Sequence, residues 1–149
     1  MSHTCNYQHI IFRTYKSEKT IPEETKSVLF AYIKKICNNQ GVQVLAINSH
    51  LDHKHILIEL PATLCVAETV KYIKQSSSKA FYRHKYFPFF DGWGTGYAAF
   101  SVSMSKRATV INYINNQGEH HRIKTFREEY EAFLKANGIA LDKYVFMDK

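Results

Sequence analysis

Two histidines flank a lysine at the start of an apolar run, Asp52 to Leu60, which has the sequence DHKHILIEL. Alternate side chains of a β-strand point to the same face, so His53 and His55 would lie side by side, about 7 Å apart along the chain. Imidazole nitrogens bind divalent ions of the first transition series, so such a pair could share one ion. Two ligands do not complete a site, however, and two histidines on a solvent-exposed strand face would give the same pattern.

The segment VINYINNQ, residues 110–117, offers two more polar side chains. Tyr113 and Gln117 are four residues apart and would share one face of a helix. An amide carbonyl oxygen is a ligand for hard cations, whereas a phenol, with a pKa of about 10, is a poor nucleophile until a base or a cation assists it. Taken separately, the tyrosine fits a half-buried helix position and the glutamine fits a solvated helix end.

Together, these four side chains could carry out one reaction. A metal ion held by two imidazoles and an amide can bind a scissile phosphate and neutralise charge as the transition state forms. A nearby tyrosine can attack phosphorus and store the bond energy as a phosphotyrosine, which permits later rejoining without ATP. A hydrolase needs no protein nucleophile, so the combination favours strand transfer.

The hydrophobic pattern predicts the elements that would position these side chains. Apolar runs bounded by turn residues indicate strands, and apolar residues at helical spacing indicate helices, in the order β-α-β-β-α-β followed by two helices. The predicted strands span residues 4–15, 42–48, 53–60 and 97–105, and the predicted helices span residues 21–40, 64–83, 106–117 and 125–138.

Residues at the helix ends support these boundaries. Pro22 and the two glutamates after it mark the start of the first helix, and Gly41 marks its end. Thr125 and Glu128 have the spacing of a capping box, and Gly138 follows the last helix.

This order of elements is the split β-α-β pattern of the ferredoxin-like class, an α+β fold that RNA-recognition modules share. It predicts a four-stranded antiparallel sheet with helices on one face and two additional C-terminal helices. The other face would stay available for a ligand, a nucleic acid or a partner subunit. Because no repeat, low-complexity tract or linker is visible, we expect one domain over residues 1–149, with a core of about residues 3–118 and a C-terminal helix and tail of about residues 119–149.

The charge balance favours a polyanionic partner. The formal net charge is +7, the pI is about 9.3 and aromatic residues reach 14%. Because no basic amphipathic helix dominates, this basic composition favours binding to nucleic acid over binding to a membrane. The residues that could contact phosphates, instead of forming an ordinary solvated face, are Lys71, Lys74, Lys79, Arg83, Lys106 and Arg107. Trp93, Tyr97 and Phe100 could stack on unpaired bases, or pack in the core.

The cysteines and the apolar runs indicate a cytoplasmic protein. Cys5, Cys37 and Cys65 are odd in number and have no paired spacing, so we expect free thiols in a reducing compartment. We see neither a signal peptide nor an apolar run long enough to span a bilayer, so no membrane partner is expected.

Several segments, taken in order, resemble a known family. The segment AINSHLDHKHILI resembles a hairpin with a His-x-His strand, FDGWGTGYAAFSVSMS resembles an aromatic loop and the strand after it, and VINYINNQGEHHRIKTFREEYEAFLKANGI resembles a catalytic helix and a C-terminal helix. The chain is similar in these blocks to the small single-tyrosine transposases of the HUH class, the type found in the bacterial insertion sequences IS200 and IS605. The resemblance covers nearly the whole chain.

The resemblance implies a role for each candidate residue. His53 and His55 would be metal ligands, Gln117 would be the third ligand, and Tyr113 would be the nucleophile. The enzyme would use Mg²⁺ or Mn²⁺ to cut single-stranded DNA, often near hairpins at the element ends, and would leave a 5′-phosphotyrosine and a free 3′-OH. The alternative is a non-catalytic protein that binds single-stranded nucleic acid, a decayed or domesticated copy on the same fold.

The resemblance also implies a homodimer, in a bacterial-type cytoplasm and nucleoid-associated when bound to DNA. The histidines of one chain would face Tyr113 of the other. The short connection SMSK before the third helix is consistent with such a shared site, because it leaves the tyrosine little chain with which to reach a central strand. A helix packed on its own sheet stays open as an alternative.

One residue departs from the family pattern. The position between the two histidines is usually bulky and apolar, and here it is Lys54. Lys54 would point to the face opposite the two histidines, beneath helices. We expect its stem to pack there while the ammonium group reaches the edge of the sheet, with a degraded, inactive site as the alternative.

Overall fold

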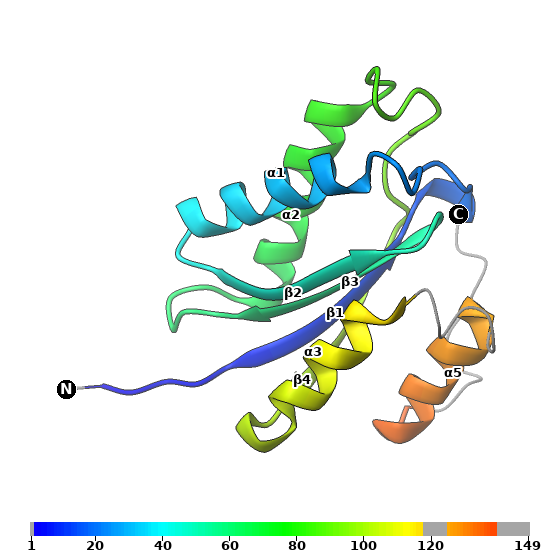
Figure 1. The fold of residues 1–149 in the computed structure, drawn as a ribbon. Helices are drawn as coiled ribbons and strands as arrows, with labels where there is room; N and C mark the ends of the chain where they lie inside the picture. Colours follow the sequence, from blue (N-terminus) through cyan, green and yellow to red (C-terminus); the bar gives the residue numbers. More distant parts are fainter. Residues whose placement is uncertain (1, 118–124, 140–149) are drawn as a thin grey trace.

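A four-stranded antiparallel sheet forms the centre of the molecule, with the strand order β2-β3-β1-β4 (Figure 1). The computed structural model describes residues 2–117 and 125–139. The strands are β1 (Tyr7–Arg13), β2 (Gln43–Ser49), β3 (His53–Glu59) and β4 (Ala98–Val102), and the helices are α1 (Lys26–Asn39), α2 (Val66–Phe81), α3 (Arg107–Asn115) and α5 (Phe126–Ala136). The predicted α+β class and the order of the elements are confirmed.

The first two helices cover one face of the sheet (Figure 1). A buried apolar cluster fills the space between these helices and the sheet. It contains Ile10, Phe12, Ile56 and Ile58 from the strands, Leu29 and Ile33 from α1, and Val70 and Ile73 from α2. The strand residues of this cluster alternate along β1 and β3, as the two-residue period of a strand requires. This layer is therefore the main core of the molecule.

The other face is covered by α3 and α5, so the expectation of an open face was wrong (Figure 1). Ile114 of α3 packs on Tyr7 and Leu57, and Leu134 of α5 packs on Ile11. The sequence contains the reason, because the apolar residues of β1 and β3 are continuous rather than alternating, a pattern of strands buried on both faces.

The helix ends follow the sequence signals closely, with one exception. The first helix begins at Lys26 instead of near Pro22, because residues 23–25 form a turn before it. Gly41 follows its end with a φ of +76°, in the left-handed region that glycine tolerates. The predicted capping box of α5 is present: the Thr125 hydroxyl accepts a hydrogen bond from the backbone N–H of Glu128, and the Glu128 carboxylate accepts one from that of Thr125.

The chain reverses after β4 through a short 3-10 turn, Met104–Lys106. This turn brings α3 back over β2 and β3 of the same sheet. The expected boundary near residue 118, between core and C-terminal helix, lies outside the described residues. In the parts of the chain that the structure describes, no helix has both the length and the apolar character that crossing a membrane demands.

Lys54 lies on the face of α1 and α2, as predicted, but its ammonium group does not reach the edge. The side chain is completely buried, and its Nζ has no hydrogen-bond partner among the described residues. Nζ lies 4.6 Å from the ring centroid of Phe30 and 5.7 Å from that of Trp93. Burial, and to a smaller extent the charge of Lys26, lowers the pKa of Lys54 well below its ordinary value.

We expect Lys54→Met to stabilise the protein at pH 7 by about 1–3 kcal/mol, because methionine fills a similar space without a buried amine. The sign of the pH effect follows from the lowered pKa. Between the folded and the unfolded pKa of Lys54, only the unfolded chain holds the proton, so the free energy of unfolding rises with pH, by at most about 1.4 kcal/mol per unit.

Denaturant unfolding of both proteins between pH 7 and pH 10 measures this effect. The stability advantage of Lys54→Met should shrink as the pH rises toward 10. Lys79→Met, at an exposed position of α2, is the matched control and should stay close to the wild type. A Lys54→Met protein less stable than the wild type at pH 7 would mean that the amine makes a net stabilising interaction.

Candidate functional site

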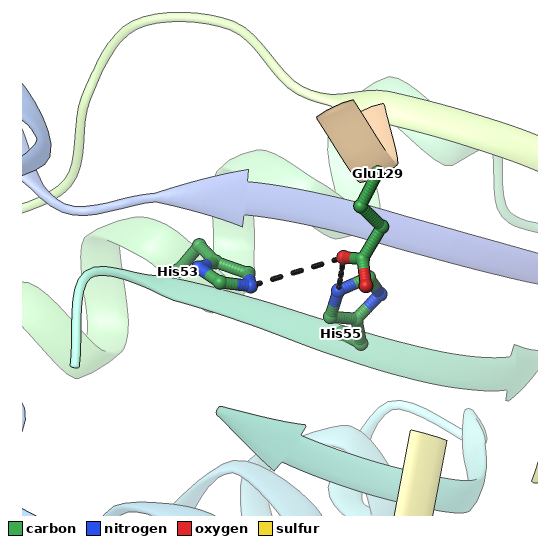
Figure 2. Close-up of side chains that lie close together, drawn as sticks. All are labelled: His53, His55 and Glu129. Atoms are coloured by element: carbon green, nitrogen blue, oxygen red, sulfur yellow. Dashed lines mark hydrogen bonds and ion pairs between the residues drawn. The ribbon is translucent and has the colours of Figure 1, made fainter. Parts of the chain in front are cut away.

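His53 and His55 project from β3 toward the face that α3 and α5 cover, and both side chains are completely buried. Figure 2 shows the Glu129 carboxylate of α5 above them. Its Oε1 atom lies 2.9 Å from Nε2 of His55 and 3.9 Å from Nε2 of His53. Two ring nitrogens and a carboxylate oxygen, all within 4.8 Å of one another, therefore converge on one point.

This donor set fits a divalent metal ion. Two imidazole nitrogens and one carboxylate oxygen suit Mn²⁺, Fe²⁺ or Zn²⁺, whereas Mg²⁺ prefers oxygen ligands and usually keeps several waters. The three donor atoms come from β3 and α5, which are in contact where Phe126 stacks on His53. The arrangement is therefore a candidate metal centre.

Each histidine is held through its other ring nitrogen. Nδ1 of His53 lies 2.8 Å from Oδ1 of Asp52, and Nδ1 of His55 lies 2.9 Å from Nε2 of His9 in β1. The ring of His53 also stacks on Phe126 of α5, with a centroid separation of 3.7 Å. Such contacts fix the orientation of both rings and leave both Nε2 atoms facing Glu129.

The buried charges shift the pKa values of the site. Burial alone would raise the pKa of Glu129, but the hydrogen bond and the charge of His55, with smaller effects of Tyr113 and His53, lower it to about 2. Burial, and secondly the charge of His55, lower the pKa of His9 to about 3. At neutral pH, Glu129 is therefore a carboxylate and His9 is a neutral imidazole.

Tyr113 lies beside the candidate metal centre. Its ring centroid is 5.8 Å from that of His55 and 6.3 Å from that of His9. Burial, followed by a hydrogen bond to Glu129 and the charge of this carboxylate, raises the pKa of the Tyr113 phenol. The phenol is therefore protonated at neutral pH in this arrangement, and it shares a hydrogen bond with the Glu129 carboxylate.

Local packing places Tyr113 there. The next residue, Ile114, is completely buried against the sheet, and Asn48 of β2 donates a hydrogen bond to its carbonyl oxygen at 2.9 Å. Gln117 is buried one turn later, and its amide donates to the Tyr113 carbonyl oxygen at 3.3 Å. A hydrogen bond between the Gln117 side chain and the phenol also acts on the pKa of Tyr113.

The four predicted site residues thus come together within one chain. The alternative of solvent-exposed histidines is contradicted, because His53 and His55 have no exposed surface. The expectation that the connection after β4 is too short for Tyr113 to reach the histidines of its own chain was wrong, because the turn after β4 folds α3 back onto β2 and β3.

Sequence reasoning missed Glu129, His9 and Asp52. Glu129 follows the predicted cap of α5 and has the pattern of an ordinary acidic residue in a first helical turn. His9 stands directly before the apolar run of β1, and a histidine at this position of a buried strand was the one available signal. Asp52 directly precedes His53, but a residue next to a strand does not reveal which side chain it contacts.

The predicted phosphate-contacting residues fall into two groups. Lys71, Lys79 and Arg83 are exposed on or just after α2, in the layer opposite the histidines. Lys74 of the same helix donates instead to the carbonyl oxygens of Gly94 and Gly96, so it holds the loop before β4.

The second group lies at the start of α3, on the same side of the sheet as the histidines. Lys106 is exposed, whereas Arg107 donates a hydrogen bond to the Tyr7 hydroxyl at 2.9 Å. Of the three aromatic residues that could stack on bases, Phe100 is buried and Trp93 packs on Phe12. Tyr97 remains available, with 41% of its surface exposed.

Comparisons with known proteins agree with the fold. The family model described as "Transposase IS200 like" matches residues 2–117. The transposase for insertion sequence element IS200 of Salmonella typhimurium is 26% identical over 136 residues, with 83% of this chain and 85% of that protein covered. The corresponding transposase of Salmonella typhi has the same identity and coverage.

Two solved structures share the fold. A putative transposase from Deinococcus radiodurans R1 has a TM-score of 0.61 at 22% identity and covers 78% of this chain and 93% of its own. A REP-associated tyrosine transposase bound to a REP hairpin has a TM-score of 0.62 at 13% identity and covers 81% and 74%. The family match extends over the sheet, the histidine pair, Tyr113 and Gln117, and the chain therefore belongs to the IS200-like transposase family.

Proposed function

We propose that this protein is a transposase that cuts and rejoins single-stranded DNA, with Tyr113 as the nucleophile and a divalent ion as cofactor. The observation that carries the proposal is the convergence of two imidazoles, a carboxylate and a phenol in one buried site. The family resemblance supplies the substrate class, the 5′-phosphotyrosine intermediate and the choice of Mg²⁺ or Mn²⁺. Of these two ions, the nitrogen-containing donor set favours Mn²⁺.

In the proposed cleavage step, the phenol oxygen of Tyr113 forms a bond to phosphorus, and the bond from phosphorus to the 3′ oxygen breaks. The phenol proton passes to Glu129, with which the phenol shares a hydrogen bond, and the departing 3′ oxygen takes a proton from water. A bound divalent ion would supply the positive charge that stabilises the phosphate oxygens in the transition state. Attack of another 3′-OH on the phosphotyrosine reverses the step and rejoins the DNA.

We propose that His53, His55 and Glu129 hold the ion, and that the Gln117 carbonyl oxygen completes the set. The resemblance assigns Gln117 as the third ligand, and its burial beside Tyr113 is compatible with this role. Glu129 adds a negative charge that Gln117 lacks. A carboxylate at the centre contributes more to binding of a divalent cation than a neutral amide does, so we assign the larger share of the affinity to Glu129.

The position of α5 constrains how DNA enters. Phe126 stacks on His53 and Glu129 contacts His55, so α5 lies directly over both histidines. A phosphate that reaches an ion held by the two histidines must therefore approach past α5 while Glu129 stays at the ion. The position of α5 then controls access of DNA to the site.

We propose single-stranded DNA with hairpins, from the ends of a mobile element, as the partner. The charge of +7 and the exposed cations Lys71, Lys79 and Lys106 support phosphate contacts, whereas Lys74, Arg83 and Arg107 already have partners within the chain. We further propose one domain over residues 1–149 and a homodimer in the bacterial cytoplasm, in which each chain carries a complete site.

We expect Tyr113→Phe to abolish a covalent protein–DNA adduct while changing DNA affinity by no more than about twofold, because only the phenol oxygen is removed. The substrate is single-stranded DNA from the sequences that flank the gene, incubated with Mn²⁺ and resolved on a denaturing gel. A 3′ label should travel with the protein and a 5′ label should not, since the 5′-phosphate is the attached end.

Tyr97→Phe, at the exposed tyrosine before β4, is the matched control and should form the adduct as the wild type does. An adduct that persists in Tyr113→Phe would point to another nucleophile. A wild-type protein that binds the DNA without forming any adduct would favour the non-catalytic alternative.

We expect His55→Ala to lower Mn²⁺ affinity by more than about 100-fold. Loss of a residue that only hydrogen-bonds to a ligand costs about 10–100-fold in metal affinity, and loss of the ligand itself should cost more. Glu129→Gln should cost more affinity than Gln117→Ala, because it removes a charge. Isothermal titration calorimetry with Mn²⁺ measures all three proteins, and Glu68→Gln, at an exposed glutamate of α2, controls for the loss of one negative charge. Loss of binding in Gln117→Ala with none in Glu129→Gln would remove Glu129 from the ligand set.

A further inference from the structure

His9 lies next to the candidate metal centre but outside its ligand set. It belongs to β1 and faces the same side of the sheet as His55, across the pairing of β1 with β3. Its side chain is 2% exposed, and its Nε2 atom lies 2.9 Å from Nδ1 of His55. The rings of Phe100 and Phe133 pack around it at centroid distances of 6.5 Å and 5.1 Å.

A contact of 2.9 Å between two ring nitrogens holds one hydrogen atom. Either His9 donates this hydrogen and His55 accepts it, or His55 donates it and His9 accepts it. In both cases these two nitrogens are each other's hydrogen-bond partner in an almost completely buried site. The two arrangements differ in what they leave on the opposite nitrogen of His55.

The requirement of a metal ligand decides between them. A neutral imidazole carries one N–H group, and the nitrogen that binds a metal must present its lone pair. Nε2 of His55 faces Glu129 and His53, and without an ion it donates a hydrogen bond to the Glu129 carboxylate. When this nitrogen binds an ion instead, it loses that hydrogen, so the hydrogen of His55 must sit on Nδ1 and Nε2 of His9 must accept it.

We propose that His9 is a positioning residue that accepts a hydrogen bond from Nδ1–H of His55 and thereby directs the Nε2 lone pair of His55 toward the metal position. The inference rests on the proposed role of His55 as a ligand. His9 itself touches neither the ion nor the DNA.

The two histidines of β3 support this assignment because they are held in the same way. Asp52 contacts Nδ1 of His53 at 2.8 Å, and His9 contacts Nδ1 of His55 at 2.9 Å. Both Nε2 atoms then face one carboxylate oxygen. An ionised aspartate can only accept a hydrogen bond. Nε2 of His9, in contrast, accepts only in the tautomer that carries the ring hydrogen on Nδ1. The proposed hydrogen bond therefore also fixes the tautomer of His9.

Two variants separate the hydrogen bond from the packing. His9→Phe keeps a ring of similar size but removes the acceptor, and we expect it to lower Mn²⁺ affinity about 10–100-fold in calorimetry. His9→Gln places an amide oxygen near the position of Nε2 and should stay within about threefold of the wild type. His3→Phe, at an exposed histidine before β1, is the control for a histidine-to-phenylalanine change.

The wild-type protein alone provides a second test. In ¹⁵N NMR spectra with diamagnetic Mg²⁺ or Zn²⁺ bound, the hydrogen should sit on Nδ1 of His55, with a nitrogen–nitrogen coupling to an unprotonated Nε2 of His9. The His55 signals are assigned from their absence in His55→Ala. This measurement holds even if His9→Phe does not fold.

The outcomes are distinct. A folded His9→Phe protein with wild-type affinity, equal losses in His9→Phe and His9→Gln, or a hydrogen on Nε2 of His9 would each overturn the proposal. A wild-type protein that binds no divalent ion at His55 would instead refute the proposed metal centre, on which the role of His9 rests.

Discussion

Burial of the sheet on both faces is the constraint on which the rest of this structure depends. Successive residues of β3 point to opposite faces, and neither face is open, so each of these residues enters a packed environment. His53 and His55 enter a layer formed by α3 and α5, while Lys54 enters the layer of α1 and α2. Burial of both faces of the sheet therefore explains both the buried histidine site and the buried lysine.

Burial of the site explains the shifted pKa values of its titratable side chains. A carboxylate that loses water must gain partners, and Glu129 finds them in His55, His53 and Tyr113, which together hold its pKa at about 2. Burial, and secondly the same carboxylate, raises the pKa of the Tyr113 phenol. Tyr113, Glu129 and the two histidines thus interact with one another in the buried site, and α5, which carries Glu129, lies over both histidines.

The sequence predicted the order of the elements and the cap of α5 because these follow from local periods and spacings, whereas the grouping of Tyr113 with the histidines came from their chemistry and from the family resemblance. It failed where the answer depends on how distant segments pack. Glu129 follows His55 by 74 residues, and the second covered face depends on α3 folding back after a short turn. Lys54 illustrates the same limit, since a long side chain reaches solvent unless a ring such as Phe30 closes over it.

The central claim is that one chain assembles a complete metal-dependent tyrosine site. Anomalous diffraction from crystals grown with Mn²⁺, recorded at the manganese edge, tests it most directly. The account predicts one manganese peak per chain between Nε2 of His53, Nε2 of His55 and the Glu129 carboxylate, with Tyr113 of the same chain beside it. A peak elsewhere, no peak at the two histidines, or a site completed by the tyrosine of a second chain would contradict it.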